Sequence, residues 1–328
     1  MNRRQALSLM ALLGTGTTAL TACQEELPEL QPTAPATAEP NLDSEQVSAV
    51  LDQLTQTLQA ADEAKDAQIL SERVKQPALN MRSAMYNVSA KTDSAIVPLQ
   101  IDPNSVTVTE RDTWPRAIVA VTKSEPEQLP AVMVVTQEDA HAPYKLETWA
   151  RLFPGRSVAT IAASEGSPVV EADSADYVLS PTQALTAWVG RLDGGEDHAD
   201  LLGEDDFTTF YQAEAKRLNE GAEAAGKVTF QATVNDGPIT GIKLADGTAI
   251  VAGSFTNAVT YEKTQERATL KVGGTAAKFL EDPQVHDEPI QITYMCTVML
   301  SLPELGTEGK ISALGAERSF TSVTRVEN

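Results

Sequence analysis

The sequence SPTQALTAWVGRL at residues 180–192 marks the point at which the chain begins a second domain. Ser180 and Gln183 have the spacing of a capping box, and Pro181 occupies the first helical position, where no backbone N–H is required. Apolar residues follow at helical spacing, at Ala184, Leu185, Trp188 and Leu192. The sequence therefore predicts a helix beginning here and a domain boundary between residues 179 and 180.

The chain after this helix is expected to form one more helix and then strands. Residues 207–223 have helical apolar spacing, and turn signals such as Asn235-Asp236-Gly237 separate the alternating segments that follow. We expect strands at residues 227–234, 239–245, 249–262, 268–272, 290–300 and 319–326.

The first half repeats this order. Asp43 or Ser44 can cap a helix, a second helical stretch follows over residues 70–85, and Pro77 is expected to kink or break it. Strands are expected at residues 105–110, 116–123, 131–137 and 144–153, with shorter pieces at 158–163 and 175–179. The sequence thus predicts an α+β fold of two tandem domains, residues 43–179 and 180–328. Each domain places helices before a curved antiparallel sheet, as NTF2-like and cystatin-like folds do.

Residues 1–22 have the features of an export signal. Arg3 and Arg4 form a basic start, an uncharged stretch follows, and Leu20-Thr21-Ala22-Cys23 matches a bacterial lipobox. Glycines and threonines at residues 14–18 make the stretch a poor membrane span. We expect a lipoprotein anchored on the extracytoplasmic face of the cell membrane through diacylglyceryl on Cys23. The arginine pair is also compatible with twin-arginine export.

Composition limits the partners. Residues 23–42 are rich in Pro, Ala, Thr and Glu and are expected to form an extended tether. The net charge is −21, and it becomes −23 without residues 1–22, because that segment carries two arginines and no acid. Because this negative charge repels the phosphates of nucleic acid, we do not expect nucleic acid as a partner.

The second cysteine has no partner for a disulfide. Cys296 lies on the face that Ile292, Tyr294, Val298 and Leu300 share in an alternating run, so we interpret it as a buried apolar side chain and not a reactive thiol. His141, His198 and His286 lie far apart in polar segments, and we expect them on the surface. The common hydrolase and phosphate-loop motifs are absent from the sequence. We therefore expect no cofactor.

Acidic residues cluster at 193–206, and the cluster has two interpretations. Asp193, Glu196, Asp197 and Asp200 are candidate calcium ligands, although their spacing does not match an EF-hand loop. We favour a solvated connection between helices that also caps the second one.

One expected strand carries a possible proton-transfer group. Tyr144, Glu147 and Trp149 lie close together, and a carboxylate beside a tyrosine inside a pocket could move a proton. We favour core packing for Trp149 and a position at the sheet margin for Glu147.

Three short segments carry a family resemblance: Trp114-Pro115-Arg116, residues 149–155 (WARLFPG) and residues 244–251 (LADGTAIV). They resemble segments of a family of uncharacterised actinobacterial lipoproteins with tandem domains. The resemblance implies the lipid anchor and the two-domain organisation, and it implies no catalytic residue.

The expected function follows from the anchor, the tether and the missing motifs. We expect a non-enzymatic binding or scaffold module for a cell-envelope protein or glycan. The alternative is a small-ligand carrier, or an enzyme without a familiar motif, that uses a pocket in one domain.

Overall fold

Three helices come first in the computed structural model, which describes residues 38–124, 128–162 and 164–326. They are α1 (Ser44–Ala64), α2 (Ala67–Leu70) and α3 (Ala78–Thr92). The Asp43 carboxylate accepts a hydrogen bond from the Gln46 backbone N–H, so Asp43 is the cap of α1. α3 begins directly after Pro77, which confirms the break expected there.

Four antiparallel strands follow: β1 (Pro103–Thr109), β2 (Arg116–Thr122), β3 (Ala131–Gln137) and β4 (Lys145–Leu152). Two very short strands come next, β5 (Gly166–Ser167) and β6 (Val169–Val170). β5 pairs with β1 in parallel, whereas β6 pairs with β8 (Thr240–Lys243) in antiparallel fashion. A mixed sheet results.

The second half begins with α4 (Pro181–Leu192) and α5 (Asp206–Ala222). Its strands are β7 (Gly226–Val234), β8, β9 (Ala249–Lys263), β10 (Leu270–Lys271), β11 (Gln284–Val285), β12 (Ile290–Leu302) and β13 (Ser312–Arg325), with the short helix α6 (Gly274–Ala277) after β10. Ser180 caps α4 through the capping box that the sequence predicts.

One eleven-stranded sheet joins the two halves within the described residues. Its order is β5-β1-β2-β3-β4-β13-β12-β9-β8-β6, and β7 pairs beside β9. β4 meets β13 through only two residue pairs, Gly315 with Leu152 and Ala316 with Arg151. Because β5 and β6 flank Pro168 and pair with opposite ends of this order, the segment 166–170 connects the two edges of the sheet.

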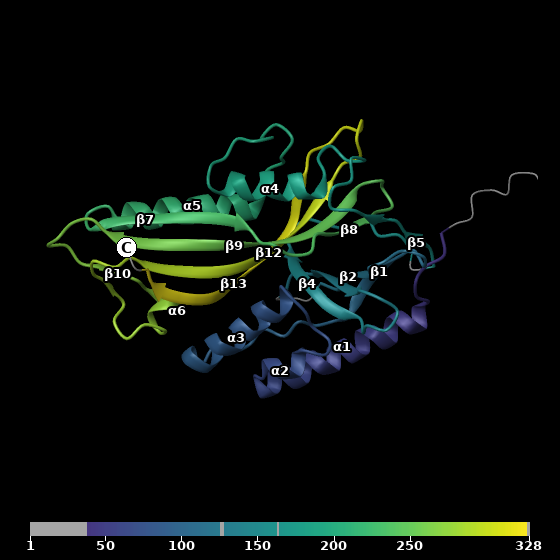
Figure 1. The fold of residues 1–328 in the computed structure, drawn as a ribbon, viewed down its shortest axis with the longest axis horizontal. Coiled ribbons are helices and arrows are strands. Elements are labelled where there is room, and N and C mark those ends of the chain that lie inside the picture. The colour runs from purple at the N-terminus through teal and green to yellow at the C-terminus, as the bar shows by residue number, and fades with distance from the viewer. Residues whose placement is uncertain (1–37, 125–127, 163, 327–328) are drawn as a thin grey trace, which may run out of the picture. The chain divides into compact units, whose positions relative to one another are not determined.

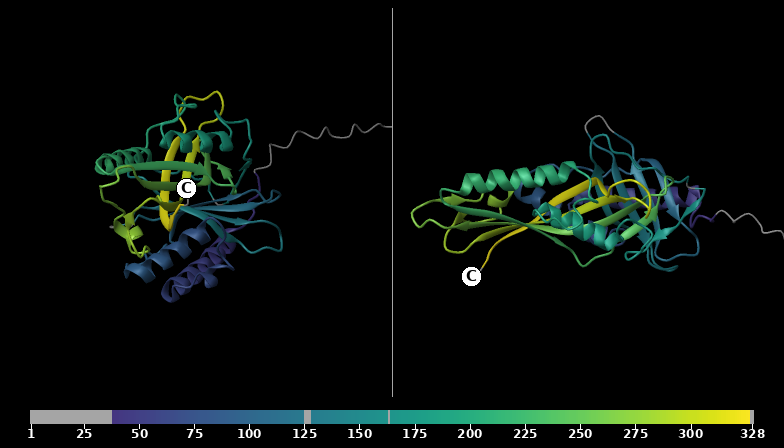
Figure 2. Two further views of the ribbon diagram at one scale, coloured as in Figure 1. Left: turned by 60° about the vertical axis from the view of Figure 1, so that its left-hand side comes forward. Right: turned by 90° about the horizontal axis from the view of Figure 1, so that it is seen from above.

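The helices lie on opposite sides of this sheet. Figures 1 and 2 show α4 and α5 along one side of β7, β9, β12 and β13, and α1 to α3 on the other side. Trp188, Phe207 and Phe255 form the aromatic centre of the core under α4 and α5. Leu54, Leu58 and the helix α3 pack against the first-half strands in a second core.

A third core lies between strands of both halves. Val119 and Val132 come from the first half and Ile250 and Met299 from the second, and all are buried. This cluster receives side chains from seven strands, β2, β3, β4, β8, β9, β12 and β13.

The α+β prediction is confirmed in its coarse form, a large mixed sheet with few helices. The boundary at residue 180 and the NTF2-like shape of each half stay predictions. Residues 158–162 contain no strand. β13 begins at Ser312, earlier than the expected start at residue 319, and Gly315 lies inside it. Among the described residues, no helix is both long and apolar enough to cross a membrane.

Candidate functional site

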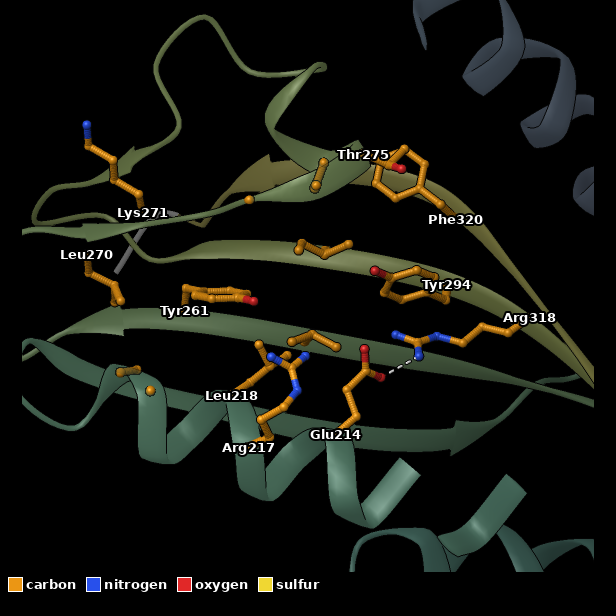
Figure 3. A pocket seen from close by; sticks show the side chains of 17 residues that line it. Glu214, Arg217, Leu218, Tyr261, Leu270, Lys271, Thr275, Tyr294, Arg318 and Phe320 are labelled. Carbon is orange, nitrogen blue, oxygen red and sulfur yellow. Dashed lines mark hydrogen bonds and ion pairs between the residues drawn. The ribbon is translucent and has the colours of Figure 1, made fainter. Parts of the chain in front are cut away.

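A pocket of about 510 Å³ lies between α5, the β10–α6 segment and the strands β9, β12 and β13. Figure 3 shows it from close by, with α5 on one side and the β10–α6 segment on the other. Its volume falls in the ordinary range for small-ligand sites. The side chains that define its chemistry are Glu214, Arg217, Leu218, Tyr261, Leu270, Tyr294, Arg318 and Phe320.

The periodicities of the helix and of the strands make these side chains face one cavity. Glu214, Arg217, Leu218 and Gly221 are spaced at i, i+3, i+4 and i+7 on α5, so they share one helix face. On the strands, residues two apart point to the same side, which gives the pairs Val259 and Tyr261, Ile292 and Tyr294, and Arg318 and Phe320. The three pairs are neighbours because β9, β12 and β13 are adjacent.

Arg318 is the central polar residue of the pocket. Its Nη1 lies 2.6 Å from Oε2 of Glu214, and its Cζ lies 3.8 Å from the centre of the Tyr294 ring. The two charged side chains are 15% and 21% exposed. The buried Nε of Arg318 has no hydrogen-bond partner among the described residues. The guanidinium, which has five N–H donors, is thus held in place while part of its donor capacity stays unused.

Arg217, on α5, adds a second positive charge to the pocket lining. It is exposed, and no ion pair joins it to an acid within the described residues. Lys271 also lines the pocket, but its side chain points away from Tyr261 and Arg318 in Figure 3, so the charged side chains that face the pocket are those of Arg217, Arg318 and Glu214. This local excess of positive charge contrasts with the net charge of −21 for the chain.

The tyrosines of the pocket stay protonated at ordinary pH. Burial raises the pKa of Tyr261, and it raises the pKa of Tyr294 despite the opposing effect of the Arg318 charge. The Tyr294 and Phe320 rings meet edge to face at 6.1 Å between centroids. The site therefore presents aromatic surface together with guanidinium donors.

A family model described as a domain of unknown function (DUF8094) matches residues 38–325. The chain belongs to the DUF8094 family. No curated protein and no solved structure matches it. The family match runs through residue 180, so it includes both predicted halves and the whole pocket of the DUF8094 domain.

Cys23, the predicted lipidation site, lies outside the described residues, as do the signal and most of the tether. Cys296 is fully buried beside the α4 and α5 core, as predicted. His141, His198 and His286 are exposed, which confirms the surface positions expected for them.

Glu147 lies away from the pocket and away from the sheet margin expected for it. Its carboxylate is 3% exposed, lies 2.8 Å from Nζ of Lys75, and accepts hydrogen bonds from Thr240 Oγ1 at 2.6 Å and Thr136 Oγ1 at 3.1 Å. A register shift between Val134 and Val135 leaves Glu147 as an extra residue in β4. The bulge turns this side chain inward, so Glu147 fastens the segment before α3 and β8 to the first-half sheet.

Tyr144 and Trp149, the other members of that group, are core residues of the DUF8094 domain. Trp149 is 1% exposed and belongs to the core under α1 to α3, which confirms its predicted packing. The buried hydroxyl of Tyr144 has no hydrogen-bond partner within the described residues, and burial raises its pKa to about 12. The structure brings neither residue to the pocket.

The acidic segment connects helices. Asp193 accepts hydrogen bonds from the Tyr211 hydroxyl at 2.8 Å and from the Ala232 backbone N–H at 2.7 Å. Asp193 and the other three candidate calcium ligands, Glu196, Asp197 and Asp200, are all exposed. In the part of the chain that the structure describes, no group of three or more His, Cys, Asp or Glu side chains is arranged to hold a metal ion. Asp205 caps α5 as predicted.

Sequence reasoning missed the pocket because its residues come from segments about a hundred positions apart. One signal was available. Arg318 falls between Ala316 and Phe320 on one face of an alternating strand, and a charged residue among apolar ones there indicates a partner or a ligand.

Proposed function

We propose that this protein is a membrane-anchored extracytoplasmic lipoprotein whose DUF8094 domain is a binding module, with the pocket over β9, β12 and β13 as its binding site. The observation that carries the proposal is the Arg318 guanidinium, fixed against Glu214 and the Tyr294 ring at the centre of a concave space. A few oriented polar groups within a largely apolar cavity are typical of ligand sites. The lipobox at residues 20–23 supports the anchor.

A scaffold role toward an envelope protein or glycan is the second candidate. Trp114 supports it, because this aromatic side chain is 39% exposed and Arg116 stacks 4.2 Å from its ring centre. Exposed Trp and Arg side chains are typical anchors of binding surfaces. Trp114 and Arg116 also belong to a segment that carries the resemblance to actinobacterial lipoproteins.

The finer fold assignment, two tandem NTF2-like or cystatin-like units, also stays a proposal. It is supported by the repeated order of helices before antiparallel strands in residues 43–179 and 180–328. In this interpretation the pocket belongs to the second unit, where α5 faces the concave side of its strands.

Binding in the pocket can be tested by native mass spectrometry of protein released gently from its own envelope. Gly221 lines the pocket, and a Cβ added there meets nothing within 4 Å, so we expect Gly221→Leu to place a bulky side chain at the pocket without a clash at its Cβ. We expect wild-type protein to carry a bound mass that Gly221→Leu lacks.

The matched control is Gly190→Leu, the same change on α4, where an added Cβ also meets open space. This variant should keep the bound mass. A bound mass that survives in Gly221→Leu would place the ligand elsewhere and refute the proposed site.

The anchor is tested separately: Cys23→Ala should abolish incorporation of labelled palmitate and release the protein from the membrane.

A further inference from the structure

We propose that the pocket binds an amphipathic anion, a molecule with one carboxylate, phosphate or sulfonate group on an apolar body. The acidic group would meet Arg217 and Arg318, and the apolar body would lie against the rings of Tyr261, Tyr294 and Phe320. This inference rests on the proposed function, because it names the ligand class of the same site.

The charge of the pocket wall points to an anion. Two guanidinium groups, those of Arg217 and Arg318, and one carboxylate, that of Glu214, face the pocket, although the chain as a whole is strongly acidic. Glu214 neutralises Arg318 in part, while Arg217 has no acidic partner among the described residues. An anion would therefore complete the charge balance of the site. A cation would be repelled by both guanidinium groups, although tyrosine rings alone can bind cations.

The hydrogen bonding of Arg318 also favours an anionic ligand. A guanidinium has five donors and prefers oxyanions that accept two parallel hydrogen bonds. Only one hydrogen bond joins Arg318 to Glu214, from Nη1, so Glu214 does not form the two-bond pairing that a guanidinium can make with an oxyanion. Figure 3 shows the guanidinium at the middle of the pocket, beside Tyr294 and directed toward Glu214.

The apolar surface of the pocket indicates that the rest of the ligand, apart from its acidic group, is apolar. Leu218, Leu270 and Phe320 line it together with the two tyrosine rings. A small hydrophilic anion such as free phosphate would leave this surface in contact with water. An apolar body covers it, and burial of apolar area is favourable by about 25 cal/mol per Å².

The test uses two fluorescent probes that differ chiefly in one charge: 8-anilinonaphthalene-1-sulfonate, an aromatic anion, and N-phenyl-1-naphthylamine, its uncharged relative. The protein is the full chain with Cys23→Ala, which removes the expected site of lipid attachment. We expect the sulfonate probe to bind. Arg217→Gln should weaken its affinity about fivefold, which corresponds to the free energy of one partly exposed ion pair. Arg217→Lys should restore most of the affinity, and dodecanoate should displace the probe better than dodecanol does.

Three results separate the possible failures. If Arg217→Gln leaves sulfonate binding unchanged while Gly221→Leu abolishes it, the pocket binds ligands but the anionic class is wrong. If Gly221→Leu leaves binding unchanged, the probes bind elsewhere and the site itself is refuted. If neither probe binds the wild-type pocket, the amphipathic ligand is refuted, and the mass-spectrometric test decides the binding function alone.

Discussion

Asp205 is the carboxylate on which the start of α5 depends. It is 5% exposed and accepts hydrogen bonds from Trp188 Nε1 at 2.9 Å and from the backbone N–H and hydroxyl of Thr208, both at 2.8 Å. Asp205→Ala removes a helix cap and leaves the buried indole N–H without an acceptor. We expect a loss of about 2–4 kcal/mol in the free energy of unfolding, measured by urea denaturation.

Asp206→Ala is the matched control for this prediction. Asp206 is the next residue along the chain and is exposed, so its removal should change the free energy of unfolding by about 0.5 kcal/mol or less. Equal effects of the two substitutions would show that only the charge of the acidic segment matters, and not the buried hydrogen bonds of Asp205.

The Cys296 thiol should be unreactive in the folded protein. It is fully buried, and burial raises its pKa to about 12, so the thiolate is scarce near neutral pH. In a Cys23→Ala protein at about pH 8, where an ordinary thiol reacts readily, N-ethylmaleimide should add no mass until guanidinium chloride unfolds the chain. Rapid native labelling would show that β12 opens and would contradict the packed core around it.

At the scale of elements, Gly315 controls the joint between the two sets of strands. It pairs with Leu152, and a Cβ at this position would lie 2.3 Å from the Arg151 carbonyl oxygen. Gly315→Ala must push β13 and β4 apart where only two residue pairs join them. We expect a loss of about 1–3 kcal/mol, as for other overpacked sites, seen as a lower melting temperature by circular dichroism.

Gly237→Ala provides the comparison. An added Cβ there has only the Ser254 hydroxyl within 4 Å, at 3.7 Å. Gly237 lies in the connection between β7 and β8, away from the contact between β4 and β13. Its melting temperature should stay near that of the wild-type protein. If both variants melt alike, the contact between β4 and β13 does not limit stability.

At the scale of the whole molecule, the shared core predicts cooperative unfolding. Met299 is fully buried among side chains from both halves, so a cavity there weakens both. We expect one calorimetric transition in the wild-type protein. Met299→Ala should cost about 2–5 kcal/mol and raise amide hydrogen exchange in β3 and β12 together. Two separate transitions, or faster exchange in β12 alone, would instead support independent domains that meet at residue 180.

The sequence was sufficient wherever a structural feature depends on neighbouring residues. Asp43 and Ser180 were identified as possible caps, Pro77 as a break and Cys296 as a buried strand residue, because capping, proline geometry and alternation act within a few positions. The α+β class follows from the same local periodicities. The lipobox at Cys23 is likewise a local signal, and its lipidation stays a prediction.

Features that depend on distant partners needed the fold. The short strands on either side of Pro168 exist because Val108 and Ile242 come close enough to pair with them. The inward turn of Glu147 comes from a one-residue shift in register, which reverses the face of a side chain and leaves no mark on composition. The pocket has the same origin, since Glu214 and Arg318 stand 104 positions apart in sequence and meet only across α5 and β13. Local preference selects helices and strands, whereas the pairing of distant strands determines which side chains share a site.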